Sequence, residues 1–146
     1  MSDTGPGNGW PPRRLEELAR AECVRLLGSK SVGRVAFVAE GSPVVLPVNY
    51  VSSDGMVYFR TSTHNVMAAH LLDAAAAFQV DDVDEFMESG WSVLVQGWAE
   101  FLDPEVETEY GLERLAHRIE PWAAGARYLL VRIKPERISG RRLEPR

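Results

Sequence analysis

The sequence predicts a single domain of the mainly-β or α+β class, folded as a small antiparallel barrel with a few short helices. Three observations lead to this expectation. The chain has 146 residues, of which 45% are hydrophobic and 25% charged, a composition typical of one globular domain. About six or seven segments are rich in β-branched and apolar residues, as strands are. Short turns join the first of these segments, which favours antiparallel neighbours.

The N-terminal part of the chain predicts a tail and a helix. Residues 1–12 are rich in Gly and Pro and contain little that could enter a core, so we interpret them as a flexible tail. The folded domain then spans residues 13–146. Leucines recur at helical spacing up to Gly28, which stands where a helix C-cap belongs, and this pattern predicts a helix over 13–27.

Three strands are expected next. Apolar and β-branched residues fill 31–39 and 44–51, and the turn between them at 40–43 contains Gly and Pro. A second turn at 52–55 leads directly into a strand over 56–61. These segments predict an antiparallel meander.

A short helix and a strand follow the meander. Apolar residues over 64–72 have helical spacing, and Thr63 is a candidate N-cap. The segment 75–81 has the composition of a strand, and the acidic run over 82–90 predicts a loop.

The C-terminal part predicts a long strand, an acidic helix and two further strands. Gly97 lies in the middle of the strand over 91–102, where a glycine marks a bulge, a bend or a close approach by another group. Asp103 and Pro104 form a cap followed by an N1 proline, which opens a helix to about residue 118. The remaining elements are a loop at 122–125 and strands at 127–133 and 137–143.

Charge and hydropathy narrow the function classes. The formal net charge of −5 argues against a nucleic-acid partner. No stretch is long and apolar enough to span a membrane, and no signal peptide is recognisable, so we expect a cytoplasmic protein. Residues 127–146 nevertheless hold seven Arg or Lys against two Glu. This basic end is either a solvated strand edge or one wall of an anion site.

The sequence predicts neither a metal site nor a catalytic side chain. Cys23 is the only cysteine and lies on an apolar helical face, as a buried inert thiol does. His64 and His70 point to different sides of the predicted helix, so they cannot hold one metal together. The acidic residues over 81–88 lack the glycine that an EF-hand loop requires.

Four segments together resemble the flavin-binding proteins of the pyridoxamine 5'-phosphate oxidase-like family. They occur in that family's order and spacing, and the resemblance covers roughly residues 15–143. The segments are Ser31–Phe37, Pro43–Tyr50, Val57–Thr61 and Gly90–Gly97, and the closing segment Val131–Arg141 also fits. The resemblance implies a split antiparallel β-barrel with Greek-key topology. It also implies a homodimer with FMN sites in the clefts between subunits, and an oxidoreductase acting on a small molecule.

The resemblance also implies where the flavin ring lies. The family places the isoalloxazine along the strand segment Pro47, Val48, Asn49 and Tyr50. Pro47 has no N–H and interrupts the strand ladder, so it frees a carbonyl to face a ligand. An edge-strand proline beside a capping asparagine would account for the same residues.

The flavin phosphate is expected at the end of the third strand of the meander. Arg60, Thr61 and the start of the following helix would form an anion site there. The alternative is a helix cap beside a surface arginine. Many relatives read Arg-Thr-x-x-Gly-x-Lys at this place, whereas this chain has His64 for the glycine and Val66 for the lysine. The departure leaves open a weak FMN site, a different flavin, or loss of the cofactor.

Two further groups of residues complete the expected site. Trp91, Ser92 and Gln96 lie on the strand that in relatives reaches the polar edge or the phosphate of the flavin. Trp122 and Arg132 lie where the family brings in a wall from the partner subunit. Packing in the core is the alternative for the two tryptophans.

Three functions stay open at this point. In the leading one, the flavin carries out hydride or electron transfer and the chain binds and orients it. The second is a non-catalytic dimeric ligand-binding protein that has lost the phosphate anchor. The third is a deazaflavin-dependent reductase, in which Arg127, Arg132 and Arg141 would line a groove for the cofactor tail. The chain lacks the Trp and His of enzymes that make pyridoxal phosphate, so oxidation of vitamin B6 is not expected.

Overall fold

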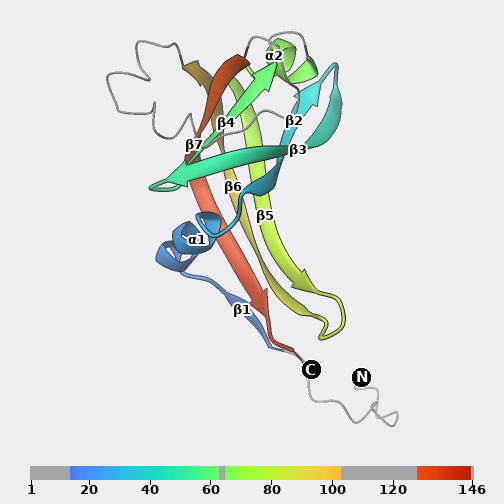
Figure 1. The fold of residues 1–146 in the computed structure, drawn as a ribbon, viewed down its shortest axis with the longest axis vertical. Coiled ribbons are helices and arrows are strands. Elements are labelled where there is room, and N and C mark those ends of the chain that lie inside the picture. The colour runs from blue at the N-terminus through green and yellow to red at the C-terminus, as the bar shows by residue number, and fades with distance from the viewer. Residues whose placement is uncertain (1–13, 63–64, 103–127, 146) are drawn as a thin grey trace, which may run out of the picture.

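The computed structural model describes residues 14–62, 65–102 and 128–145. These residues form strands β1 to β7 and helices α1 and α2 (Figure 1). In chain order the elements are β1 (Leu15–Glu17), α1 (Arg20–Leu27), β2 (Val32–Ala39), β3 (Ser42–Ser53), β4 (Met56–Ser62), α2 (Val66–His70), β5 (Ala74–Asp84), β6 (Ser89–Leu102) and β7 (Tyr128–Leu143).

All the strands belong to one antiparallel sheet that curls into a partly closed ring. The strand order is β1-β7-β4-β3-β2-β5-β6, and β6 also pairs with β7, which brings the two ends of the sheet together. The shortest ladder of the ring joins β2 and β5, where only Arg34–Ala36 pair with Ala77–Gln79. Figure 1 shows β5, β6 and β7 running on beyond β2, β3 and β4 as a narrow arm, with β1 beside the end of β7. The predicted split barrel is confirmed.

The core lies inside the ring because alternate residues of each strand point inward. In β2, for example, Val35 and Phe37 are buried while Arg34 and Val38 are exposed. This alternation is the period-two pattern of a sheet with one buried face. The largest fully buried side chains include Phe59, Phe78, Leu27, Leu71, Ile133 and Val35.

A β-bulge divides β7 and decides which of its side chains face outward. Gln96 pairs with Arg137, whereas the next residue of β6, Gly97, pairs with Pro135, so Glu136 is the extra residue. One extra residue reverses the alternation of every residue beyond it. Of the three possibilities that Gly97 left open, the structure shows a bulge together with a close approach by the backbone of Lys134. The predicted break near Pro135 is wrong, because the bulge accommodates the proline within a single strand.

The first helix was predicted over 13–27, but the structure has it only from Arg20 to Leu27. Residues 15–17 form β1, and Leu15 pairs with Leu143 at the end of β7. The edge of β7 therefore supplies backbone hydrogen bonds that a helical turn would otherwise make, and α1 begins only at Arg20. Helical spacing alone does not reveal this long-range pairing.

The predicted acidic loop is mostly strand. The β5–β6 ladder continues to Asp84, which pairs with Ser89, and only residues 85–88 form the turn. Acidic side chains can be solvated on the exposed face of a strand as well as in a loop. The acidic composition of this segment therefore does not exclude strand pairing. Several sequence predictions lie outside the described residues: the tail over 1–12, Thr63, His64, the helix over 103–118 and the loop over 122–125.

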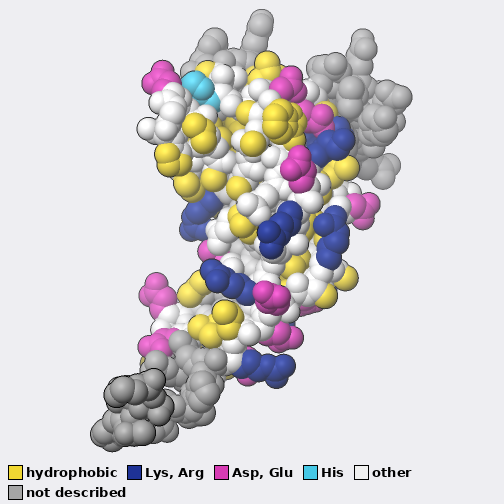
Figure 2. All heavy atoms as spheres, turned by 180° about the vertical axis from the view of Figure 1, so that it is seen from behind, with side chains coloured by type: hydrophobic (Ala, Val, Ile, Leu, Met, Phe, Trp, Pro, Cys, Tyr) yellow, Lys and Arg dark blue, Asp and Glu magenta, His cyan; other side chains and the backbone are white. Residues whose placement is uncertain are grey.

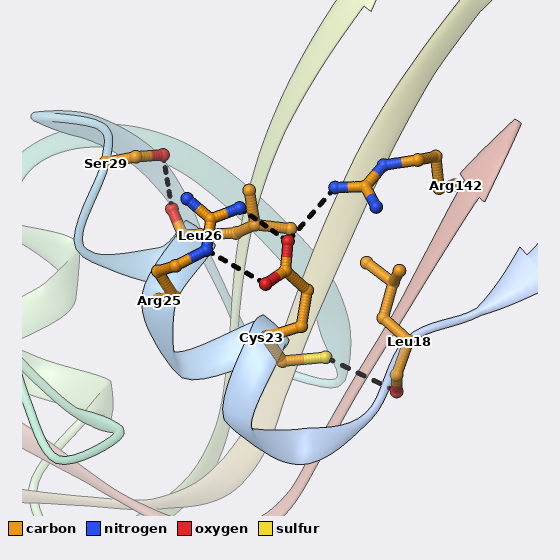
Figure 3. A network of polar contacts seen from close by, with 7 residues as sticks. Leu18, Cys23, Arg25, Leu26, Ser29 and Arg142 are labelled. Atoms are coloured by element: carbon orange, nitrogen blue, oxygen red, sulfur yellow. Dashed lines mark hydrogen bonds and ion pairs between the residues drawn. The ribbon is translucent and has the colours of Figure 1, made fainter. Parts of the chain in front are cut away.

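Helix α1 packs against β7 and adds its buried face to the core. Cys23 is fully buried there, and its Sγ lies 3.8 Å from the carbonyl oxygen of Leu18, as Figure 3 shows. Burial raises the pKa of this thiol. The predicted burial of this cysteine is confirmed.

An ion-pair network fastens α1 to β7. Glu22 accepts hydrogen bonds from Nε of Arg25 at 2.9 Å and from Nη2 of Arg142 at 3.2 Å (Figure 3). The hydrogen bond from Arg25, followed by that from Arg142, lowers the pKa of Glu22 from 4.5 to about 2.

This network predicts an acid-dependent loss of stability. A carboxylate whose pKa is lower in the folded chain stabilises the fold above its unfolded pKa, and that contribution disappears as the pH falls through the folded value. Between pH 4.5 and about 2 the melting temperature of the parent should fall more steeply than that of Glu22→Gln. Melting curves over that range, with Glu85→Gln as an exposed control, check this. Parallel pH profiles for the parent and Glu22→Gln would contradict it.

Candidate functional site

The predicted flavin segment of β3 splits between the two faces of the sheet. Pro47 pairs with Arg34 and Asn49 with Val32, and these residues point outward. Val48 and Tyr50 point into the core. Only two of the four predicted side chains can therefore meet a ligand on the outer face.

The side chain of Tyr50 has a structural role. It is 3% exposed, and its ring lies 4.6 Å from that of Phe78 in an edge-on arrangement. Its hydroxyl donates to the carbonyl oxygen of Leu27 at 2.5 Å, which satisfies a carbonyl at the end of α1. Burial raises the pKa of this tyrosine. Its backbone N–H also donates within the protein, to Ser31.

Arg60 lies next to Asn49 on the outer face. Tyr50 pairs with Phe59 in the β3–β4 register, so Asn49 and Arg60 are the next positions along the two strands. On its other side Arg60 pairs with Leu130 of β7. Within the described part of the chain, the Arg60 guanidinium has no ion-pair partner.

Thr61 contacts the residue that caps the next helix. It is 2% exposed, and the amide Nδ2 of Asn65 donates to its hydroxyl at 2.8 Å. Oδ1 of Asn65 accepts from the backbone N–H of Ala68 at 3.1 Å, so Asn65 is the N-cap of α2. Asn65 was not predicted from the sequence, although asparagine directly before an apolar helical segment is a recognised N-cap signal. Thr61 therefore positions the N-cap residue and does not cap the helix itself, in contrast to the helix-cap interpretation.

Val66 is the first residue of α2 and lies at the surface. Its side chain is 39% exposed. It is not a core residue of the helix, so a longer polar side chain at this position would reach solvent without being buried.

The predicted residues of β6 lie apart from those of β3 and β4. Ser92 and Gln96 point outward, like Pro47 and Asn49, but β2 and β5 lie between the two pairs. Three strand spacings separate β3 from β6, roughly 14 Å. Trp91 points inward and packs against the core, in agreement with the structural alternative.

The predicted wall residue Arg132 is neutralised within the chain. Its Nε donates to Oε1 of Glu100 at 2.6 Å, and its strand neighbour on β4 is the buried Tyr58. An arginine held in this way is a poor partner for an external anion. Trp122 and Arg127, the other residues predicted for this region, lie outside the described residues.

A groove of about 630 Å³ lies on the outer face of the arm. It runs over β5, β6 and β7 beside β1. Its lining includes Gln79, Ser92, Leu94, Arg137, Ser139 and Arg141. No group of three or more His, Cys, Asp or Glu side chains in the described ranges could hold a metal ion. In the same ranges no helix has the length and apolar character needed to cross a membrane.

Comparison with known proteins places this chain among flavin-binding relatives. Residues 19–142 match the family model for pyridoxamine 5'-phosphate oxidase. An uncharacterised protein from Mycobacterium tuberculosis is 40% identical over 137 residues, covering 90% of this chain and 87% of that protein. The FAD binding protein from Mycobacterium smegmatis superposes with a TM-score of 0.74 at 29% identity, covering 88% of this chain and 100% of that one. A FAD-binding protein from Mesorhizobium loti superposes with a TM-score of 0.71 at 26% identity, covering 91% and 99%.

Proposed function

The chain belongs to the pyridoxamine 5'-phosphate oxidase family, and from this premise we propose that it binds a flavin and acts as an oxidoreductase on a small molecule. The observation that carries the proposal is the guanidinium of Arg60, which has no partner among the described residues and adjoins the outward-facing Asn49. A flavin has an anionic phosphate and a polar ring edge, and these two side chains match them in chemistry.

The residues of this surface fit a flavin in several respects. The Arg60 guanidinium can bind the phosphate, and the amide of Asn49 adjoins it on the outer face, on the side of the predicted ring. Pro47 has no N–H, so the strand offers the ring an apolar surface at that point. A bound flavin would supply the hydride or electron transfer, while the chain binds and orients it. The described residues provide no side chain whose position requires an acid or base role.

The phosphate end of the site bears on which flavin the chain binds. FMN is the flavin that the sequence resemblance implies, yet Val66 replaces the lysine that would hold its phosphate. Both FAD-binding relatives are more than a quarter identical to this chain. We therefore propose that the FMN moiety is bound with modest affinity by Arg60 alone, and that FAD gains affinity from contacts elsewhere.

We also propose that the functional unit is a homodimer with its sites between the subunits. Exposed apolar residues lie on the outer face of β2 and β3, among them Val32, Val38 and Val45. Figure 2 shows hydrophobic side chains gathered over the wider end of one face of the molecule. Apolar surface of this kind favours a symmetric subunit contact. The partner's β6 would then supply Ser92 and Gln96, which lie too far from Arg60 within one chain.

The proposed site predicts that Arg60→Ala weakens FMN binding by about ten- to a hundredfold. The reason is the loss of a charge-assisted hydrogen bond to the phosphate. Riboflavin, which lacks the phosphate, should bind the parent and the variant alike. Fluorescence titration with both flavins measures this, and Arg20→Ala, another exposed arginine, serves as the control. Unchanged FMN affinity in Arg60→Ala would show that the phosphate binds elsewhere.

A further inference from the structure

The outer face of the arm carries a row of apolar residues near its tip. Val83 of β5 pairs with Gly90 of β6. Gly90 pairs in turn with Leu143 of β7, whose other neighbour is Leu15 of β1. Gly90 has no side chain, so the row is open at its centre, and a hollow of about 300 Å³ lies there. A hollow of this volume is at the small end of the range for ligand sites, so it suits a small molecule.

A guanidinium and a hydroxyl border the hollow on the side toward the barrel. Ser92 pairs with Arg141 in the β6–β7 register, and both residues line the hollow. Each lies two residues from the apolar row on its own strand, so the two rows face the same way. Arg141 forms no ion pair within the described ranges, and neither does Glu17, which is opposite it in the β1–β7 register. A guanidinium beside a hydroxyl can donate to both oxygens of one carboxylate.

The other acidic residues that line the hollow leave this border open to an anion. Asp81 forms an ion pair with Arg34 at 3.7 Å and accepts a hydrogen bond from Nε2 of Gln79 at 2.8 Å, so its charge is balanced. Glu88 lies in the turn at the tip of the arm, four residues along the chain from Ser92. The hollow is therefore apolar at its centre and has an arginine at one end.

We propose that this hollow binds a small carboxylic acid with an apolar body. The carboxylate is held by Arg141 and Ser92, and the body lies against Leu15, Val83 and Leu143. The guanidinium contributes a charge-assisted hydrogen bond, and removal of apolar surface from water adds to the affinity. All these residues belong to one chain, so the site does not depend on the flavin surface.

One consequence of the site rests on the proposed function. In the proposed homodimer, the partner's β6 brings Ser92 to the flavin surface. A carboxylic acid bound at that serine would therefore adjoin the flavin of the other subunit.

Titration calorimetry of the full chain with benzoate, without added flavin, tests the site. Arg141→Gln should weaken benzoate binding by about tenfold or more, because the charge-assisted hydrogen bond is lost. Arg137→Gln is the matched control, since it removes an arginine of the same strand that lines the neighbouring groove but not the hollow. It should leave the affinity within about twofold. Glu17→Gln removes the like charge opposite Arg141 and should tighten benzoate binding.

Three further ligands separate the charge from the apolar body. Benzamide has the shape of benzoate without its charge, and acetate has the charge without the ring, so both should bind the parent about tenfold or more weakly than benzoate. Inorganic phosphate that binds as tightly as benzoate would overturn the assignment to a carboxylic acid. Val83→Thr keeps the branched shape but replaces a methyl group with a hydroxyl, and it should weaken benzoate binding by a few-fold. Equal melting temperatures should show that the variants are folded.

The outcomes distinguish this site from the flavin function. Equal benzoate affinity in the parent and Arg141→Gln, or no benzoate binding by the parent, would overturn the assignment of the hollow. If that happens in a chain that binds FAD, the flavin function stands alone. If benzoate binds through Arg141 in a chain that binds no flavin, the hollow is a carboxylate site and the proposed flavin function fails.

Discussion

Gly97→Ala is expected to lower the free energy of unfolding by about 3 kcal/mol or more, or to prevent folding altogether. A Cβ at Gly97 would lie 1.8 Å from the carbonyl oxygen of Lys134 and 3.1 Å from Cα of Pro135. Both are backbone atoms of the neighbouring strand. They can move away only if the β6–β7 ladder opens at the bulge, and that ladder closes the ring.

Gly28→Ala is the matched control for this substitution. Its Cβ would meet nothing closer than 3.5 Å, and its φ of −78° is ordinary for alanine. Chemical denaturation of both variants should therefore show a large loss for Gly97→Ala and almost none for Gly28→Ala. If Gly97→Ala retains the parent's midpoint and slope, β6 and β7 do not approach each other this closely at the bulge.

Val66→Lys is expected to tighten FMN binding by about ten- to a hundredfold. The substitution restores the positive charge that many relatives carry at this position, beside the end of β4 where Arg60 lies. Because Val66 is 39% exposed, the new ammonium stays in water and the melting temperature should not fall. Riboflavin should gain almost nothing, and the FMN gain should shrink as salt is added.

Leu72→Lys provides the control for charge alone. Leu72 is also exposed and lies just beyond α2, so it adds the same charge away from the phosphate position. Parallel titrations of FMN and riboflavin should show selectivity only in Val66→Lys. Equal gains in the two variants would attribute the effect to net charge, and no gain in either would place the phosphate away from α2.

The existence of most strands and the pairing within the meander follow well from local sequence. Alternation and turn residues predict the meander of β2, β3 and β4, and a glycine inside a long apolar strand pattern marks Gly97 as a bulge, a bend or a close approach. What local sequence does not contain is pairing between distant segments. Leu15 looks helical from its neighbours, and only the free edge of β7 turns it into a strand. The same limit explains the extension of β5 through Asp84.

The candidate site was predictable in part. Alternation in β3 already implies that Val48 and Tyr50 share one face and Pro47 and Asn49 the other, because side chains of a strand alternate. The hollow of the arm was missed because Val83, Leu143 and Leu15 come side by side only through the pairing of distant strands. Arg132 looked available in the sequence, but Glu100 comes beside it only through the β6–β7 ladder.

Gel filtration of the full chain with FAD, monitored by visible absorption, asks directly whether this outer face is a flavin site. We expect flavin absorption to elute with the protein, at the mass of a dimer, and Arg60→Ala to carry less of it. Protein that elutes without flavin absorption, after incubation with excess FAD, would contradict the proposal.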